Sequence, residues 1–294
     1  MTIAIVTGAS RGLGRLIAID LAKAGVDLLL VGRDKERLLA TARALKDTEP
    51  TARVAPVQVD LADNFAIDQI TSAARDFGGA DILINNAAIQ GPIGNSWDVS
   101  TADFDETFRM NFTIPCALCR ALIPGMIAKG SGWIVNVSGG GATSPRPMFS
   151  AYGAAKTALV RFSETLASEC AENGVRVNSI APGAFRSGMT DAVIAAGQIA
   201  GSKEIGVANN LLAKDSDAAE RAAALISYLV VGEGRDITGK LISAVWDDWP
   251  LFHEPNKLTG DLYTLRRTVP PEKVPATAQS ERLAPDRVIG DLVA

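Results

Sequence analysis

The sequence predicts an α/β domain in which helices cover both faces of a doubly wound parallel sheet. Short apolar segments near residues 3, 27, 54, 82, 133, 175 and 240 alternate with helical stretches near residues 13, 37, 65, 104, 152 and 218. This alternation is typical of parallel sheets, because each crossover between parallel strands carries a helix onto a face of the sheet. Ligands of such sheets bind outside the carboxyl ends of the strands. The polar, glycine or proline residues that follow strands, and so converge on that edge, are Gly8, Asn86, Ser138 and Pro182.

The first strand, Thr2–Val6, runs directly into the glycine-rich loop Thr7–Gly14, which opens a helical pattern. Glycine lets the backbone turn tightly and approach a pyrophosphate, and the free N–H groups of a helix start attract the anion. The spacing Gly-x-x-x-Gly-x-Gly is a weak signal by itself, but its place between a strand and a helix favours nucleotide binding over an ordinary turn. The residues expected around the phosphates are Gly8, Ser10, Arg11, Gly12, Leu13 and Gly14.

The end of the second strand, Val26–Val31, predicts the choice of cofactor. An acidic residue there would bind a ribose 2′-hydroxyl, but the chain reads Gly32-Arg33. Arg33 and Arg11 could pair with a 2′-phosphate through charge-assisted hydrogen bonds, so NADP(H) is favoured over NAD(H). The alternative is that Arg33 begins the next polar helix and points to solvent. Asp34, beside it, could be mistaken for the ribose-binding acid.

Tyr152 and Lys156 stand one helical turn apart, so a phenol and an ammonium would share one helix face. A free tyrosine ionises near pH ~10, and a neighbouring cation favours the phenolate, which suits proton transfer to a carbonyl oxygen. The spacing alone is weak evidence, because a surface tyrosine beside a solvated lysine arises often on amphipathic helices.

Five motifs, in their order and separations, resemble those of the short-chain dehydrogenase/reductase superfamily: Thr7–Gly14, Asn85–Ala88, Asn111, Tyr152–Lys156 and Pro182-Gly183. The resemblance covers about residues 1–245 and implies a Rossmann-like fold. It implies that Tyr152 is the general acid/base, that Lys156 lowers its pKa and holds the nicotinamide ribose, and that Asn111 maintains a water-linked proton path. It also implies that Asp60 and Leu61 lie near the adenine, that Asn86, Ala87, Pro182 and Gly183 contact the cofactor, and that Asn85 steadies the central sheet.

Two departures from the family pattern concern single residues. Ala88 stands where the asparagine motif usually ends in glycine. The serine that polarises the substrate oxygen falls, by the commonest interval before Tyr152, on Gly139, with Ser138 one place earlier. Because strand residues alternate sides, this shift could turn the hydroxyl away. Ser138 is the best candidate, and the alternative is a serine that only ends its strand. Thr143, Ser144 or a water molecule could substitute.

Residues 191–212 are loosely helical and are interrupted by Gly197, Gly201 and Gly206, which predicts a mobile lid over about residues 184–215. The resemblance implies that this lid covers the substrate. The residues expected to line the substrate pocket are Met148, Phe185, Arg186 and Met189. Arg186 could pair with an acidic substrate group or could point to solvent.

Residues 1–249 are predicted to form one nucleotide-binding and catalytic domain that includes this lid. Residues 250–294 lack a helical period long enough for a core of their own. We expect an extended C-terminal arm that packs on the pocket or on a neighbouring subunit; the alternative is a partly disordered tail.

Composition excludes several classes of protein. The chain has 294 residues, of which 47% are hydrophobic and 21% charged, with a net charge of −4; this excludes a disordered or fibrous protein and argues against nucleic-acid binding. The apolar runs are strand-sized and the N-terminus passes directly into the glycine loop, so no membrane partner and a cytoplasmic location are expected. The single histidine, His253, makes a Ser-His-Asp hydrolase or a histidine-rich metal site improbable, and no metal is expected. Cys116 and Cys119 have redox spacing but lie in an apolar helical run, which favours core packing.

The sequence therefore predicts an NADP(H)-dependent oxidoreductase that interconverts a ketone or aldehyde with an alcohol. Its predicted partner is a small carbonyl or alcohol substrate, and the resemblance implies a homodimer or homotetramer. One alternative is an epimerase or dehydratase that uses nicotinamide transiently. Another is a catalytically idle NADPH-binding sensor, which would follow if Gly139 truly replaces the polarising serine.

Overall fold

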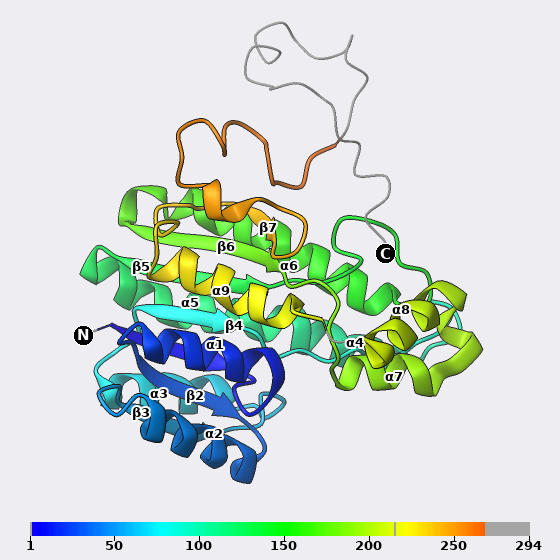
Figure 1. Ribbon diagram of the computed structural model, residues 1–294, viewed down its shortest axis with the longest axis horizontal. Coiled ribbons are helices and arrows are strands. Elements are labelled where there is room, and N and C mark those ends of the chain that lie inside the picture. The colour runs from blue at the N-terminus through cyan, green and yellow to red at the C-terminus, as the bar shows by residue number, and fades with distance from the viewer. Residues whose placement is uncertain (1, 215, 268–294) are drawn as a thin grey trace, which may run out of the picture.

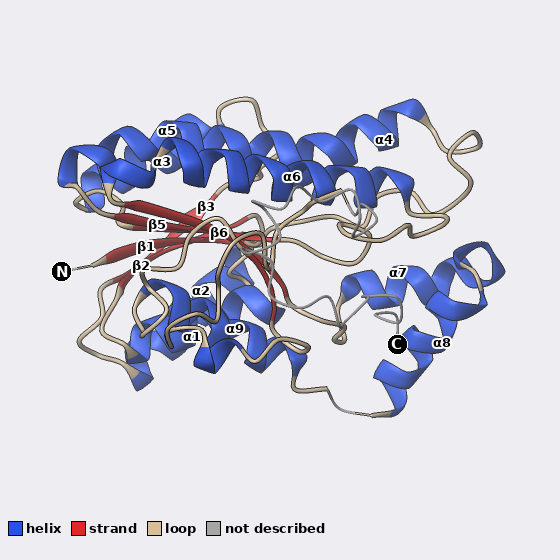
Figure 2. Cartoon of the chain, turned by 90° about the horizontal axis from the view of Figure 1, so that it is seen from above, coloured by secondary structure: helices blue, strands red, loops and turns tan. Residues whose placement is uncertain are grey.

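The computed structural model describes residues 2–214 and 216–267, and in them a seven-stranded parallel sheet lies between two layers of helices (Figures 1 and 2). The strand order is β3-β2-β1-β4-β5-β6-β7, and every neighbouring pair is parallel. The strands are β1 (Ile3–Thr7), β2 (Asp27–Gly32), β3 (Val54–Gln58), β4 (Ile82–Asn85), β5 (Gly132–Val137), β6 (Val175–Ala181) and β7 (Leu241–Ser243). This architecture confirms the predicted doubly wound, Rossmann-like fold.

Helices cover both faces of the sheet, as Figure 2 shows. One layer holds α1 (Gly12–Lys23), α2 (Lys35–Thr48) and α9 (Ala218–Val230), and the other holds α3 (Ala66–Phe77), α4 (Thr101–Phe108), α5 (Ile114–Lys129) and α6 (Ser150–Glu169). All residues of β1, β2 and β4 are buried, as expected for central strands that are covered on both sides. Two large apolar clusters result, one on each face.

The helix that runs from Thr101 to Lys129 is longer than the sequence pattern indicated. It joins α4, a π-helical turn η1 (Arg109–Thr113) and α5 without a break. By length and composition alone it could cross a membrane, so the interpretation that all apolar runs are strand-sized was wrong. Leu118, Cys119 and Met126 are nevertheless fully buried against the sheet, as in a core helix of a globular domain.

The cysteines of this helix confirm the prediction of core packing. Cys119 is buried and Cys116 half-buried, and both are free thiols. The Asn85 amide donates to Cys119 Sγ at 3.5 Å. Burial raises the pKa of both thiols, which keeps them protonated and unreactive.

The first part of the predicted arm packs on the domain. After the 3-10 turn η4 (Trp249–Leu251), Phe252 is only 6% exposed and belongs to the core cluster on the α1 and α9 side. Its ring centre lies 4.7 Å from that of Tyr263. The predicted boundary at residue 249/250 therefore does not coincide with a gap in the packing, and residues 268–294 of the arm lie outside the described part of the chain.

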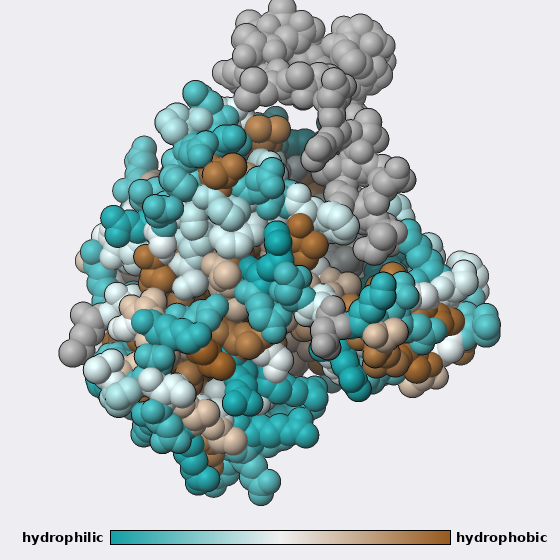
Figure 3. Space-filling view, in the orientation of Figure 1, coloured by the Kyte–Doolittle hydropathy of each residue, from teal (hydrophilic) through white to brown (hydrophobic). Residues whose placement is uncertain are grey.

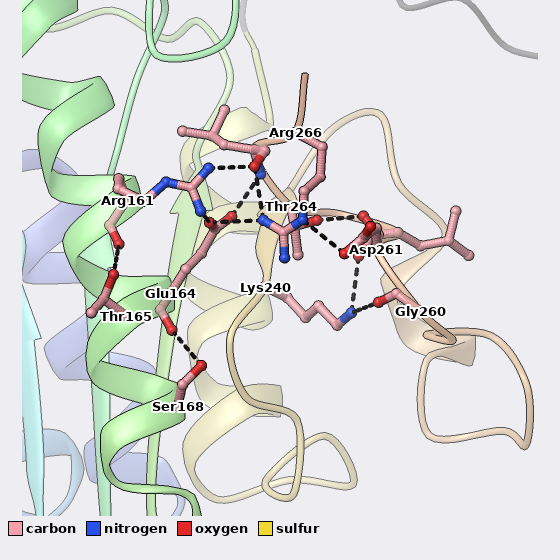
Figure 4. A network of polar contacts seen from close by, with 11 residues as sticks. Arg161, Glu164, Thr165, Ser168, Lys240, Gly260, Asp261, Thr264 and Arg266 are labelled. Atoms are coloured by element: carbon pink, nitrogen blue, oxygen red, sulfur yellow. Dashed lines mark hydrogen bonds and ion pairs between the residues drawn. The ribbon is translucent and has the colours of Figure 1, made fainter. Parts of the chain in front are cut away.

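A polar network fastens residues 260–266 to α6 and β7 (Figure 4). Glu164 accepts a hydrogen bond from the Leu265 backbone N–H at 2.6 Å and pairs with Arg266 Nη1 at 3.3 Å. Lys240 donates to the Gly260 and Leu262 carbonyls at 3.1 and 3.0 Å. This segment also reaches the edge strand, because Leu241 N–H donates to the Tyr263 carbonyl.

Candidate active site

The glycine loop presents bare backbone at the carboxyl end of β1. Gly8 and Gly12 have positive φ angles, +68° and +51°, which glycine adopts without strain. A Cβ atom on Gly14 would lie 2.2 Å from the Gly8 carbonyl oxygen, so this position cannot take a side chain without movement. No side chain caps the start of α1, whose N-cap residue is Arg11. The first N–H groups of this helix therefore have no side-chain acceptor, which fits a pyrophosphate.

The loop is tied to β4 through Thr7. Its hydroxyl accepts hydrogen bonds from the N–H groups of Asn86 at 2.9 Å and Ala87 at 3.0 Å, and the Asn86 amide donates to the Thr7 carbonyl at 2.9 Å. Two segments predicted to contact the cofactor thus lie side by side at one sheet edge.

The two predicted phosphate-binding arginines, Arg33 after β2 and Arg11 in the glycine loop, are both exposed. Ser10 lies against Gly32, since a Cβ atom on Gly32 would be 3.5 Å from the Ser10 side chain, and this brings the loop next to Arg33. The Asp34 carboxylate caps α2: it accepts from Arg37 N–H at 3.0 Å and pairs with Arg37 Nε at 3.2 Å. Asp34 is therefore engaged as the cap of its own helix.

The other predicted cofactor residues also lie at carboxyl ends of strands. The Asp60 carboxylate accepts from Ala62 N–H at 3.0 Å just beyond β3, and Leu61 is buried. Beyond β6, Pro182 is buried and Gly183 has a φ angle of +81°. A Cβ atom on Gly183 would lie 2.4 Å from Val245 Cγ2, so this close approach also requires glycine.

Tyr152 and Lys156 lie on the buried face of α6, at 6% and 2% exposure. Lys156 Nζ donates to the Val137 carbonyl at 2.7 Å and lies 5.8 Å from the centre of the Tyr152 ring. Burial lowers the pKa of Lys156 to about 7 and raises the pKa of Tyr152. The positive charge of Arg146 acts against this rise in the Tyr152 pKa. The resemblance implied that Lys156 lowers the pKa of Tyr152. Burial instead raises this pKa, and the positive charge that opposes the rise belongs to Arg146.

Asn111 lies in the π-helical turn η1 and is fully buried. Its Oδ1 accepts from Ile89 N–H at 3.0 Å, and its Nδ2 donates to the Ile89 carbonyl at 2.9 Å. The side chain therefore holds the segment that follows β4. A π turn adds a residue to the helical repeat and often occurs at functional sites.

The central sheet contains a chain of buried amides. Asn85 Nδ2 donates to Asn136 Oδ1 at 2.8 Å, and Asn136 Nδ2 donates to Ser163 Oγ at 2.8 Å. These contacts tie β4 to β5 and α6, in agreement with the structural role expected for Asn85.

Gly139, and not Ser138, faces the tyrosine hydroxyl. A Cβ atom on Gly139 would lie 2.4 Å from Tyr152 Oη. Ser138 is 2% exposed, and its hydroxyl has no hydrogen-bond partner among the described residues. The structure therefore does not bring Ser138 into hydrogen-bond contact with Tyr152, because the one-residue shift along the strand end turns its side chain into the core.

The described part of the predicted lid, residues 184–214, contains α7 (Gly188–Ala196), a 3-10 turn η3 (Gly197–Ala200) and α8 (Ser202–Ala213). In Figure 2 these helices stand beyond the sheet, beside the carboxyl ends of the strands. Figure 3 shows apolar side chains on the outer surface over α7 and α8, where Ile194, Ile199 and Leu212 are exposed.

The predicted substrate residues divide into two groups. Met148 packs with lid residues in a small apolar cluster around Phe149, and its φ angle of +70° is unusual for a residue other than glycine. Met189 is half-buried at the start of α7. Phe185, in contrast, packs against the core cluster on the α1 and α9 side, and Arg186 is exposed. In the part of the chain that the structure describes, no contact joins Phe185 or Arg186 to Tyr152.

Sequence reasoning missed Arg146, which lies between Tyr152 and the lid. Its guanidinium is 3.9 Å from the centre of the Phe149 ring and 5.8 Å from that of Tyr152. It forms a bidentate ion pair with Glu204 of α8, with Nε to Oε1 at 3.0 Å and Nη2 to Oε2 at 2.5 Å. The available signal was an arginine held between two prolines, Pro145 and Pro147, six residues before the tyrosine.

Known proteins are similar to this chain over most of its length. A family model for short chain dehydrogenase matches residues 2–197. The 2,3-dihydro-2,3-dihydroxybenzoate dehydrogenase of Bacillus subtilis is 34% identical over 245 residues, which cover 80% of this chain and 91% of that protein. The D-beta-hydroxybutyrate dehydrogenase of Rhizobium meliloti is 32% identical over 248 residues, which cover 82% and 95%. Among solved structures, the L-sorbose reductase from Gluconobacter frateurii, complexed with NADPH and L-sorbose, has a TM-score of 0.72 and 29% identity, covering 82% of this chain and 94% of that one. With its parallel sheet, bare glycine loop and buried tyrosine–lysine pair, the chain belongs to the short-chain dehydrogenase/reductase family of nicotinamide-dependent oxidoreductases.

Proposed function

We propose that this protein is an NADP(H)-dependent oxidoreductase that interconverts a ketone or aldehyde with an alcohol. The observation that carries the proposal is the placement of Tyr152 and Lys156 on one buried face of α6, at the same carboxyl edge of the parallel sheet as the bare glycine loop. The relatives named as dehydrogenases and reductases support the reaction class.

Each group at the site has a separate task. Bound NADP(H) supplies or accepts the hydride. Tyr152 gives its proton to the substrate oxygen during reduction and takes it back during oxidation. Lys156 holds the nicotinamide ribose and can change charge near neutral pH, because its pKa is about 7. Asn111 fixes the segment after β4 and supports the water-linked path that returns a proton.

The preference for NADP(H) is supported by the exposed guanidinium groups of Arg11 and Arg33 and by the engagement of Asp34 as a helix cap. Arg33→Ala is expected to weaken NADPH binding about 10-fold or more, since a charge-assisted hydrogen bond contributes about 1.5–3 kcal/mol, and to leave NADH binding nearly unchanged. Calorimetric titration of both cofactors tests this. Equal losses for the two cofactors would contradict the assignment.

The first activity experiment follows absorbance of reduced nicotinamide with NADPH and NADH across a panel of ketones, aldehydes, keto acids and keto sugars. Tyr152→Phe should bind NADPH normally and lose turnover by at least about 100-fold, as expected for removal of a general acid. Tyr228→Phe, which removes a hydroxyl far from the proposed site, is the matched control. Retained turnover in Tyr152→Phe would exclude the proposed proton donor, and product formation without net cofactor consumption would favour an epimerase or dehydratase.

A second candidate, an NADPH-binding sensor without turnover, is favoured by one observation. Gly139 offers no hydroxyl beside Tyr152, so the usual side-chain polarising group is missing there. Tight NADPH binding with no turnover on the whole panel would select this candidate.

We place the substrate among small hydroxy and keto acids, because the two relatives named above carry dihydroxybenzoate and hydroxybutyrate in their names. A cytoplasmic location and assembly into a homodimer or homotetramer complete the proposal. Fractionation of the native host and light scattering of the purified protein test these two points.

A further inference from the structure

We infer that Arg146 binds a carboxylate of the substrate, and that Glu204 occupies this carboxylate position while the substrate is absent. This inference rests on the proposed function, because it places the anion-binding group next to the proposed proton donor.

Arg146 lies close to the reacting group. Its guanidinium carbon is 5.8 Å from the centre of the Tyr152 ring. Its aliphatic stem runs along the glycine segment after β5: a Cβ atom on Gly141 would lie 3.3 Å from Arg146 Cβ, and one on Gly140 would lie 3.9 Å from Arg146 Cδ. Because Gly139–Gly141 carry no side chains, the arginine approaches the tyrosine across bare backbone. A substrate oxygen at Tyr152 and a substrate carboxylate at Arg146 would thus belong to one small molecule.

The guanidinium is held in a fixed orientation. It stacks at 3.9 Å on the ring of Phe149, which is fully buried, and the arginine side chain is only 19% exposed. Stacking and burial reduce the entropy lost on binding and strengthen a planar, bidentate contact with a carboxylate. A free surface arginine would have neither advantage.

In this structure the guanidinium of Arg146 already binds a carboxylate, that of Glu204. Both Glu204 oxygens contact the guanidinium, at 3.0 and 2.5 Å, and the Glu204 side chain is 17% exposed. Such a partly buried guanidinium is costly to leave unpaired, so an internal carboxylate is expected when no ligand is present. Exchange of one carboxylate for another keeps the arginine paired throughout, which avoids the desolvation cost of an empty site.

Glu204 is also well placed to leave. It lies in the first turn of α8, which follows Gly197 and Gly201. Both glycines have positive φ angles, +52° and +85°, and both have open space where a Cβ atom would be. The apolar contact of the lid with the catalytic loop is small: its buried members are Phe149, Val193, Ala200 and Ala208. Separation of α8 from the catalytic loop therefore breaks few buried apolar contacts with that loop besides the ion pair.

This arrangement makes opposite predictions for the two partners. Arg146→Gln removes the site, so binding of acids should weaken about 10-fold to 100-fold, the loss expected when a charged hydrogen-bonded contact is removed. Glu204→Gln removes the competing internal carboxylate, so acids should bind several-fold more tightly. If the pair were only a latch for the lid, both substitutions would weaken binding, and they would do so equally for charged and neutral ligands.

The experiment compares benzoate with benzamide as binding probes, and acetoacetate with acetoacetamide as substrate probes, on the full-length protein saturated with NADPH. Dissociation constants come from calorimetry and kcat/KM from cofactor consumption, for the wild type, Arg146→Gln, Glu204→Gln and the double variant. Arg53→Gln breaks a remote ion pair with Asp27 and controls for general loss of stability. Thermal unfolding with and without NADPH verifies that each variant folds.

The expected result is a selective loss for the acids in Arg146→Gln, a selective gain in Glu204→Gln, and no effect on the amides. Equal effects on acids and amides, or weaker acid binding in Glu204→Gln, would overturn the inference. Turnover of neutral substrates without any preference for acids would also overturn it, together with the placement of the substrate among hydroxy and keto acids, and would leave the proposed oxidoreductase reaction intact. Selective acid binding without turnover of any substrate would instead support the carboxylate site and count against the proposed oxidoreductase.

Discussion

The buried ammonium of Lys156 predicts an unusual dependence of stability on pH. In the folded protein the pKa of Lys156 is about 7, whereas an unfolded chain gives lysine a pKa of about 10.4. Between these values the unfolded chain binds a proton that the folded protein does not bind. The free energy of unfolding therefore rises with pH in this range, and below pH 7 the full cost of burying the charge is present.

The size of the effect follows from these two pKa values. Compared with a lysine whose pKa is the same in the folded and unfolded chain, Lys156 lowers the free energy of unfolding by about 4 kcal/mol at pH 7 and by about 2 kcal/mol at pH 9. The contribution of this residue should thus change by about 2 kcal/mol over two pH units. Tyr152 and the cysteines have raised pKa values and act in the opposite direction at higher pH, so the wild-type profile alone does not isolate the lysine.

The assay is urea unfolding at pH 6, 7, 8 and 9 without cofactor, for the wild type, Lys156→Met and the exposed control Lys35→Met. Methionine keeps much of the length of the side chain and removes its charge. We expect Lys156→Met to gain stability relative to the wild type at pH 7, and this advantage to shrink by about 2 kcal/mol at pH 9. Profiles of Lys156→Met and wild type that stay parallel across this range would refute the reasoning, because they would mean that the lysine has an ordinary pKa.

Three further predictions concern packing and catalysis. Gly14→Ala places a Cβ atom 2.2 Å from the Gly8 carbonyl oxygen, so it should lower the free energy of unfolding by about 1–3 kcal/mol and weaken NADPH binding. Gly125→Ala is the control, because its Cβ atom would enter open space within α5, and it should be neutral or stabilising. Chemical unfolding measures the stability of both variants, and calorimetry measures their NADPH binding. Phe252→Ala should lower the free energy of unfolding by about 3–5 kcal/mol, because the ring is in the core. Leu251 is 43% exposed, so Leu251→Ala should lower the free energy of unfolding far less. A small loss for both variants would mean that this segment is not part of the core. Gly139→Ala should displace Tyr152, because the new Cβ atom would lie 2.4 Å from the tyrosine hydroxyl. We expect kcat to fall at least about 10-fold while the NADPH affinity stays unchanged. An unchanged kcat would show that Tyr152 does not act from this position.

The features that depend on short stretches of sequence could be predicted. The glycine loop, the strand and helix alternation and the Tyr152–Lys156 pair each follow from spacing within one or two elements. The engagement of Asp34 as a cap was also accessible, because its partner Arg37 is three residues away.

The features that could not be predicted depend on contacts between distant segments. Arg146 meets Glu204 only because the lid folds back over the loop before α6, and the two residues are 58 positions apart. The one-residue shift between Ser138 and Gly139 was visible in the interval to Tyr152, but the placement of Gly139 against the tyrosine hydroxyl depends on how α6 packs on the end of β5. The burial of Phe252 could not be predicted, because the residues that cover it, including Tyr263 and the core cluster on the α1 and α9 side, are not its neighbours in the sequence.

The segment that covers β7 has a consequence for how copies of this chain can meet. Edge strands with free N–H and C=O groups invite a further strand from another molecule. At one edge, the Leu241 N–H is taken by Tyr263 and the Ser243 N–H by Asp247 of the same chain. At the other edge, β3 carries Pro56, which has no N–H to donate. Both borders of the described sheet are therefore partly closed to strand addition, by hydrogen bonds within the chain at β7 and by Pro56 at β3.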